Sequence, residues 1–280
     1  MTPWWERLPD TIGGLATRWE LVVGEPVGRG GTSLVVRCRR RDGSRAMMKL
    51  SPEPRLATAE ALALRAWEAS GRVPAVWEYD AEVGALLLEG FPNETPLSEL
   101  SEVGELGDVA GLIRALHGSG SPAIGGGLVS LAERVEFNFD HWTERHGGDP
   151  AVTGVVPLVR LARGREPALA LAADDVAPVL LHGDLHPANV LDGGAERGLV
   201  AIDARRCVGD PAFDGVDWVF WRAEGPDAWK ARSQELATAI ACDGERLWSW
   251  CASCAAILAA AEVARTGASS RVRGLLSLAP

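Results

Sequence analysis

The stretch HGDLHPANVL, residues 182–191, places Asp184 and Asn189 on one short polar segment directly after an apolar run. A second carboxylate, Asp203, ends the apolar run LVAID, 14 residues after Asn189. A gap of that length suits a β-hairpin that returns Asp203 beside Asn189.

An aspartate at the end of an apolar strand is costly to bury unless it is paired or bound to a metal. An asparagine and an aspartate, without Cys or His at ligand spacing, favour Mg²⁺ over zinc. Asp184 is then free to accept a proton from a substrate hydroxyl. The simpler alternative is a polar turn between two strands.

A glycine-rich segment, GRGGTS, lies between two strand-like runs at residues 28–33. Gly28, Gly30 and Gly31, followed by Thr32 and Ser33, would let backbone N–H groups approach an anionic group. No Gly-Lys-Ser/Thr follows and no helix begins there, so the segment is not a Walker loop. A glycine-rich hairpin turn without any ligand is the alternative.

Lysine is scarce in this chain, which contains only Lys49 and Lys230. Lys49 ends the apolar run AMMKL, where a compact ammonium group could bridge phosphate oxygens. A strand-end lysine that reaches into water is the alternative. Glu60 lies on the following helix-like stretch, where it could pair with Lys49.

The elements that would position these residues change in character along the chain. The first ninety residues predict the order strand, strand, strand, helix, strand, strand, with a D-G hairpin at residues 42–43. Beyond Pro96 the pattern is mostly helical, interrupted by two short strand-like runs that contain Asp184 and Asp203. Cys251 and Cys254 form a C-x-x-C inside an alanine-rich helical stretch, which favours two small apolar residues on a buried helix over a metal site.

The pattern H-G-D-x-x-x-x-N followed by I-D resembles the catalytic and metal-binding motifs of the aminoglycoside phosphotransferase and choline kinase-like branch of the protein-kinase fold. The ordered match runs from about Gly28 to Trp218, and GDPAFD after Asp203 also matches this branch. Within the branch, PRLATAEALALRAWEASGRVPAV is most similar to the streptomycin 6-phosphotransferase and hydroxyurea phosphotransferase group.

The resemblance implies an α+β, bilobal protein-kinase-like fold. A small antiparallel-sheet lobe would span residues 1–92, with the hinge near 89–92, and a mostly helical lobe would span 93–280. ATP and magnesium would sit between the lobes, and a substrate hydroxyl would be phosphorylated. The implied site residues are the base Asp184, the magnesium ligands Asn189 and Asp203, Lys49 on the α/β-phosphates, Glu60 positioning Lys49, and the backbone of Glu89 and Phe91 on adenine.

The sequence also departs from protein kinases. Gly183 replaces the arginine of the H-R-D motif, and Asp203 is followed by Ala204 and Arg205 instead of Phe-Gly. No A-P-E segment is present, which argues against control by a phosphorylated activation loop.

The charge of the chain indicates the class of partner. The net charge is −10, with residues 131–250 carrying 12 basic and 20 acidic residues, so a cationic small molecule is favoured and nucleic acid is not. Asp217 and Trp221 are four residues apart on one predicted helix, which suits a cationic group, and His186 lies near the predicted site of the γ-phosphate. We also expect a cytoplasmic chain without a membrane segment, as a monomer or weak dimer.

Three functions are compatible with these features. The first is an ATP- and magnesium-dependent kinase of an aminoglycoside, most readily streptomycin. The second is a kinase of the same fold acting on a sugar, an amino alcohol or hydroxyurea. The third is a catalytically silent nucleotide-binding module, which would not need Lys49, Asp184, Asn189 and Asp203 together.

Overall fold

The computed structural model describes residues 3–27, 33–101, 104–120 and 129–280. The chain forms two compact units: residues 1–101 with 188–205, called unit 1, and residues 102–187 with 206–280, called unit 2. The units differ from the predicted lobes 1–92 and 93–280, because residues 188–205 group with the N-terminal part of the chain. Residues 188–205 contact the N-terminal part of the chain at several places; for example, the Ala201 N–H donates to Arg72 O, and Leu191 forms a β-bridge with Pro96.

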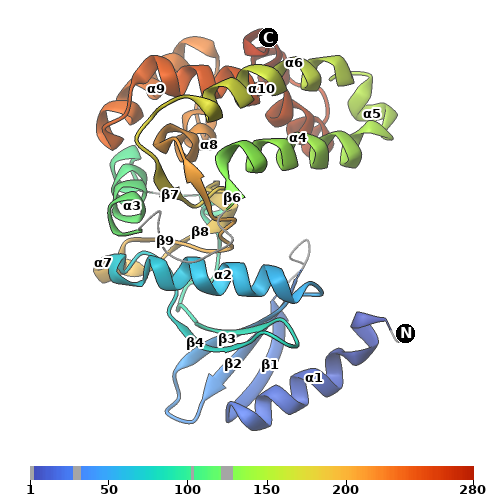
Figure 1. The fold of residues 1–280 in the computed structure, drawn as a ribbon, viewed down its shortest axis with the longest axis vertical. Helices are drawn as coiled ribbons and strands as arrows, with labels where there is room; N and C mark the ends of the chain where they lie inside the picture. Colours follow the sequence, from blue (N-terminus) through green and yellow to red (C-terminus); the bar gives the residue numbers. More distant parts are fainter. Residues whose placement is uncertain (1–2, 28–32, 102–103, 121–128) are drawn as a thin grey trace. The chain divides into compact units, whose positions relative to one another are not determined.

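Unit 1 is built on a five-stranded antiparallel sheet in the order β1-β2-β3-β5-β4 (Figure 1). Its elements are α1 (Trp4–Arg18), β1 (Leu21–Val27), β2 (Leu34–Arg40), β3 (Arg45–Leu50), α2 (Pro54–Ala66), β4 (Val76–Asp80), β5 (Ala85–Glu89), and later β8 (Val190–Asp192), α7 (Gly194–Arg197) and β9 (Leu199–Ala201). The predicted order of strands and helix in the first ninety residues is confirmed. The D-G turn is also confirmed: Gly43 has φ +84°, a conformation that glycine adopts at little cost.

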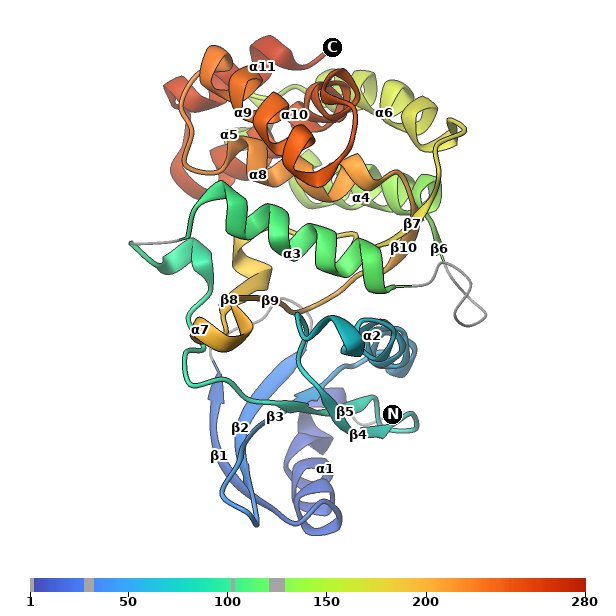
Figure 2. The same cartoon turned by 90° about the vertical axis from the view of Figure 1, so that its left-hand side faces the viewer.

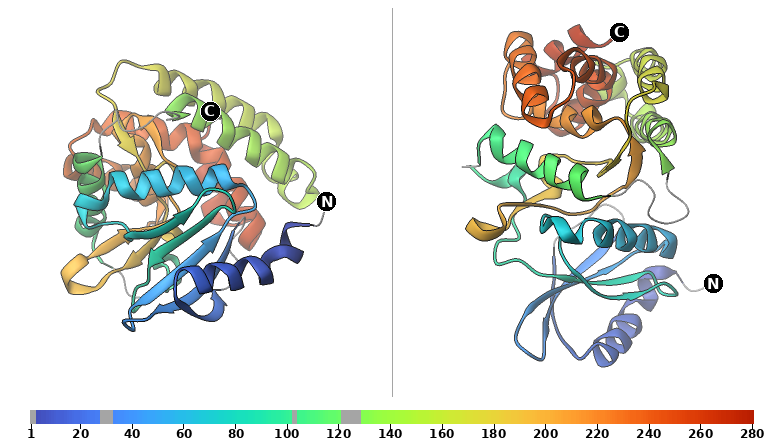
Figure 3. Two further views of the ribbon diagram at one scale, coloured as in Figure 1. Left: turned by 60° about the horizontal axis from the view of Figure 1, so that its bottom comes forward. Right: turned by 60° about the vertical axis from the view of Figure 1, so that its left-hand side comes forward.

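Side chains of β3 alternate between the sheet face that contributes to the core cluster and the opposite face, which carries Lys49. Ala46, Met48 and Leu50 are buried in a cluster with Leu15 of α1, and Lys49 points to the opposite face because successive strand side chains alternate. The strands run between α1 and α2 in the left view of Figure 3. Helix α1 was missing from the sequence prediction; its apolar residues Trp4, Leu8 and Ile12 pack against this cluster.

Unit 2 is mostly helical. Its elements are α3 (Leu106–Ser119), β6 (Val129–Ser130), α4 (Leu131–Gly147), α5 (Pro150–Thr153), α6 (Leu158–Ala173), β7 (Val179–Leu181), β10 (Cys207–Gly209), the 3₁₀ helix η4 (Pro211–Gly215), α8 (Val216–Phe220), α9 (Pro226–Ile240), α10 (Gly244–Thr266) and α11 (Ser270–Leu278). The strand β10 pairs with both β6 and β7. The strand β7 ends at Leu181, directly before the HGD motif.

Helix α10 is the central helix of unit 2. It packs against α6, α9 and α11, which lie together in Figure 2. By length and composition α10 could cross a membrane, although no apolar run of that length was expected from the sequence; 56% of its apolar window is buried, as in the core helix of a globular unit. Cys251 is buried on α10, and burial raises the pKa of Cys254 to about 12, which agrees with a packing role for the C-x-x-C pair.

Candidate active site

Lys49 is the centre of a charged cluster in unit 1. Its Nζ lies 2.7 Å from Glu60 Oε2 and 2.9 Å from Asp203 Oδ1. The ion pair expected between Lys49 and Glu60 is thus present. Burial by itself would lower the pKa of Lys49, but the two carboxylates outweigh it and the pKa is raised, so the ammonium stays charged. Burial raises the pKa of Glu60, an effect that Lys49 opposes.

Asp203 follows β9 in an uncommon backbone conformation. Its φ is +58°, in the left-handed region, which non-glycine residues seldom occupy and which aspartate tolerates better than most. Outliers of this kind persist where the surrounding structure holds them, often at functional sites. Here the conformation accompanies the contact of Asp203 with Lys49.

The hairpin β8–β9 brings Asn189 and Asp203 to neighbouring positions. Val190 pairs with Ala201, and one step further the Ile202 N–H donates to Asn189 O at 2.9 Å. Asp203 is the next residue, so the hairpin predicted from the 14-residue gap is confirmed. The side chains offer only oxygen donors to a cation, a carboxylate that is 42% exposed and a buried carboxamide, and this donor set fits Mg²⁺. The roles of the two residues as magnesium ligands stay predictions.

The glycine-rich segment lies mostly outside the described residues, which leaves Gly28, Gly30, Gly31 and Thr32 untested. Ser33 is described, partly buried, immediately before β2. Val27 of β1 pairs with Val35 of β2, so the segment connects two antiparallel neighbours, as predicted.

The predicted hinge residues are held by an arginine that the sequence did not suggest. Arg197 Nη1 donates to both carboxylate oxygens of Glu89 at 2.7 and 2.8 Å, and its guanidinium lies 5.2 Å from the centre of the Phe91 ring. Arg197 also donates to Gly71 O and Val73 O. The Glu89 N–H donates to Ala75 O. The Glu89 N–H is therefore engaged within unit 1, and the contact of the Glu89 and Phe91 backbone with adenine stays a prediction.

In unit 2, Asp214 holds the backbone of the HGD motif. Its Oδ2 accepts from the His182 N–H at 2.9 Å and its Oδ1 accepts from the Gly183 N–H at 3.0 Å. His117 Nε2 lies 3.0 Å from Asp214 Oδ2. Burial raises the pKa of Asp214, but the hydrogen bond and charge of His117 outweigh it, so the pKa is lowered and the carboxylate stays ionised. Asp214 thus orients backbone that lies about thirty residues earlier in the chain.

The departure at Gly183 has a structural reason. Its φ is +77°, which an arginine at this position would adopt only under strain. Arg134 Nε of α4 donates to Gly183 O at 3.3 Å, so side chains from two elements hold this peptide.

Asp184, His186 and Asp217 form the charged surroundings of the predicted base. Asp184 Oδ1 lies 3.8 Å from His186 Nε2. Asp217 of α8 is partly buried; burial raises its pKa to about 6, His186 opposes the rise, and Asp184 and Asp214 add to it. This grouping places two of the three predicted substrate residues beside the predicted base.

Trp221 directly follows α8 in an extended conformation, so the prediction that it lies on one helix with Asp217 is wrong. Its ring already has neighbours. It meets the Trp218 ring edge-to-face at 5.2 Å, and the Arg222 guanidinium lies 5.0 Å from its centre. A substrate cation at Trp221 would therefore compete with Arg222 for the ring. The role of Trp221 stays a prediction.

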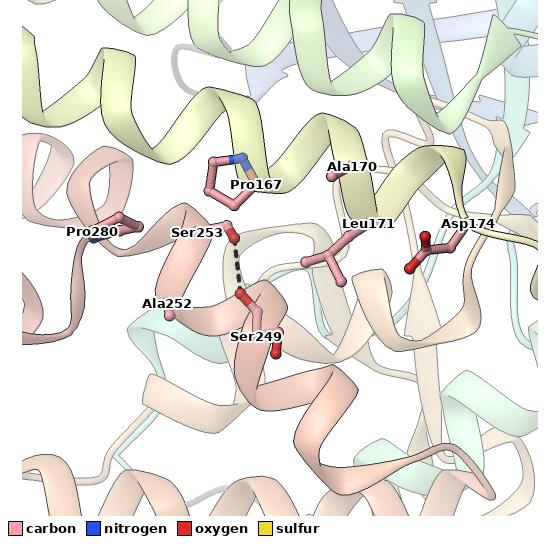
Figure 4. Close-up of a pocket in the computed structure, with 8 residues that line it drawn as sticks. All are labelled: Pro167, Ala170, Leu171, Asp174, Ser249, Ala252, Ser253 and Pro280. Carbon is pink, nitrogen blue, oxygen red and sulfur yellow. Dashed lines mark hydrogen bonds between the residues drawn. The ribbon is translucent and has the colours of Figure 1, made fainter.

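A pocket of about 400 Å³ in unit 2 is separate from these residues. Figure 4 shows its lining by Pro167, Ala170, Leu171, Asp174, Ser249, Ala252, Ser253 and Pro280. Asp174 there is paired with Arg246 at 2.8 Å. None of the predicted site residues lines this pocket, and its small apolar side chains offer little chemistry.

Comparisons with known proteins agree with the geometry. Residues 18–267 match the family of aminoglycoside/hydroxyurea antibiotic resistance kinases. The chain is 35% identical over 212 residues to a streptomycin 6-kinase of Streptomyces griseus, which covers 75% of the chain and 66% of that protein. It is also 35% identical over 250 residues to a hydroxyurea phosphotransferase of Kitasatospora aureofaciens, which covers 88% of the chain and 70% of that protein. The chain thus spans about two thirds of the length of these relatives.

Solved structures show the fold. Choline kinase LicA from Streptococcus pneumoniae matches with a TM-score of 0.64 at 15% identity, covering 97% of this chain and 99% of that one. Aminoglycoside phosphotransferase APH(4)-Ia matches with a TM-score of 0.62 at 14% identity and the same coverage. The expected kinase-like fold is confirmed, with an antiparallel sheet in unit 1 and helices in unit 2. Together with the match over residues 18–267, this shows that the chain belongs to the aminoglycoside/hydroxyurea antibiotic resistance kinase family.

Proposed function

We propose that the protein is an ATP- and magnesium-dependent phosphotransferase that inactivates an aminoglycoside antibiotic by phosphorylating one of its hydroxyls. The observation that carries this proposal is the contact of Lys49 with both Glu60 and Asp203, on the same unit as the Asn189–Asp203 hairpin. A nucleotide-binding module without chemistry would need no base, yet Asp214 and His117 hold the HGD motif from inside unit 2.

The chain's own residues have defined parts in the reaction. Magnesium, when bound to Asn189 and Asp203, supplies charge neutralisation for the phosphates. Lys49 binds phosphate oxygens, and Glu60 keeps its ammonium in place. Asp184 accepts the proton of the acceptor hydroxyl as the new O–P bond forms, and the electrons of the broken P–O bond leave with ADP.

Streptomycin is the substrate that we propose first. Unit 2 contains 21 acidic and 14 basic residues, a net charge of −7, against 17 and 14 in unit 1. The two guanidinium groups of streptomycin would be attracted by the negative charge of unit 2 and by Asp217 beside Asp184. The relatives named for streptomycin and for hydroxyurea are equally identical to this chain, so hydroxyurea is the second candidate.

The experiment is a measurement of ADP release with streptomycin, hydroxyurea and a neutral sugar, with detection of the phosphorylated product by mass spectrometry. We expect phosphorylated streptomycin, and loss of turnover when magnesium is chelated. If only hydroxyurea or the sugar is phosphorylated, the alternative small-metabolite kinase replaces the antibiotic kinase. If none supports turnover although ATP binds, the proposed phosphotransferase activity on these acceptors is wrong.

A further inference from the structure

Arg205 is a charged residue of unit 1 that the reaction described above does not use. It follows Asp203 by two positions, where protein kinases carry glycine. Its Nη2 lies 3.9 Å from Asp203 Oδ1, the same oxygen that Lys49 contacts at 2.9 Å. The carboxylate assigned to magnesium therefore has two cations on one of its oxygens.

The neighbouring arginine does not share this environment. Arg206 is buried and belongs to unit 2, and burial lowers its pKa. The side chain of Arg205 is 27% exposed, more than that of Lys49, which is 11% exposed. The two successive arginines thus differ in burial, and the guanidinium of Arg205 lies beside Asp203.

The cluster contains two cations and two carboxylates. Lys49 and Arg205 balance Glu60 and Asp203, and the charge of Arg205 is felt as far as Glu60, whose pKa it acts to lower. Lys49 is buried and held by Glu60, which limits its movement. Arg205 has no such burial, and its planar guanidinium can donate two parallel N–H bonds to a phosphate, which an ammonium group cannot.

The position of Arg205 selects one part of the nucleotide. Asp203, as a predicted magnesium ligand, would face the charge of the β- and γ-phosphates, so a guanidinium beside it would be placed to bind phosphate oxygens. We propose that Arg205 is a further catalytic residue, whose guanidinium binds the terminal phosphate of ATP. This inference rests on the proposed function, because it requires nucleotide at the Lys49–Asp203 cluster.

The test compares two nucleotides by calorimetry. The magnesium complexes of ADP and of a non-hydrolysable ATP analogue are titrated into the unmodified protein, Arg205→Gln and Arg205→Lys. We expect Arg205→Gln to weaken the triphosphate analogue by about 10-fold or more, the scale of a lost charge-assisted hydrogen bond, and to change ADP affinity by less than about 3-fold. Arg205→Lys keeps the charge without the fork and should lose less than Arg205→Gln.

Arg41→Gln is the matched control. Arg41 is also in unit 1, with a side chain 77% exposed at the opposite end of β3 from Lys49, and its change should affect neither nucleotide. Equal losses for both nucleotides in Arg205→Gln, or no loss for either, would overturn the inference while leaving the proposed function intact. Absence of nucleotide binding by the unmodified protein would overturn both. The ADP affinity also reports folding of each variant.

Discussion

The backbone directly before Asp184 is held by Asp214. Asp214 binds the N–H groups of the two preceding residues, so removing the Asp184 charge should leave the loop in place. We expect Asp184→Asn to reduce kcat by roughly 10²-fold or more, the usual effect of losing a general base, with nucleotide affinity and Tm nearly unchanged. Asp175→Asn, at an exposed aspartate of unit 2, is the control. A near-normal kcat in Asp184→Asn would show that another group is the base.

The raised pKa of Asp217 predicts the sign of a pH dependence in the stability of the protein. Its folded-state pKa, about 6, lies above the value of about 4 for an unfolded aspartate. Folding therefore favours the neutral carboxyl, and this contribution is complete below about pH 4 and lost as the pH rises through about 6. At pH 8 the protein carries the cost of a partly buried carboxylate.

Asp217→Asn removes that ionisation. Its free energy of unfolding should exceed that of the unmodified protein at pH 8 by about 1 to 3 kcal/mol, since one pKa unit corresponds to about 1.4 kcal/mol and Asp217 is partly exposed. At pH 4.5 the difference should be much smaller. Chemical denaturation at the two pH values measures it, and an equal difference at both would show that the Asp217 pKa is not raised.

At the scale of elements, Arg197 connects the β8–β9 hairpin to β5. It donates to Gly71 O, Val73 O and the Glu89 carboxylate, all within unit 1. Arg197→Met keeps much of the side chain's apolar length but leaves these acceptors without their donor. We expect a loss of about 2 to 4 kcal/mol in unfolding free energy, together with faster amide exchange in β8 and β9. Arg41→Met should change neither quantity, and an unaltered exchange rate in Arg197→Met would contradict the connection.

The sequence predicted those parts of the site that are close together in the chain. The 14-residue gap predicted the Asn189–Asp203 hairpin, and Lys49 with Glu60 was predicted from a strand followed by a helix. His117 and Arg197 were missed, because their partners Asp214 and Glu89 lie about a hundred residues away and leave no periodic pattern. Helix α1 was missed because its polar residues and Pro9 obscure the apolar face that packs on the sheet.

At the scale of the whole molecule, the negative charge is divided unequally. Unit 2 carries a net −7 of the total −10, and it contains the proposed base Asp184 and its neighbour Asp217. Long-range attraction of a cationic substrate is screened by salt within a Debye length, about 10 Å at 0.1 M, whereas a neutral substrate experiences no such attraction. Salt dependence therefore separates the two candidate substrates.

We expect kcat/KM for streptomycin to fall by about an order of magnitude between roughly 20 and 300 mM salt, while the value for hydroxyurea changes by less than about 2-fold. The double change Glu224→Gln and Asp227→Asn, at carboxylates of unit 2, should reduce the slope because it lowers the charge that attracts the substrate. Glu20→Gln with Asp42→Asn removes the same charge from unit 1 and is the matched control, with a smaller expected effect. A streptomycin rate that does not depend on salt, or one that responds equally to both double changes, would show that the acidic excess of unit 2 does not attract the substrate.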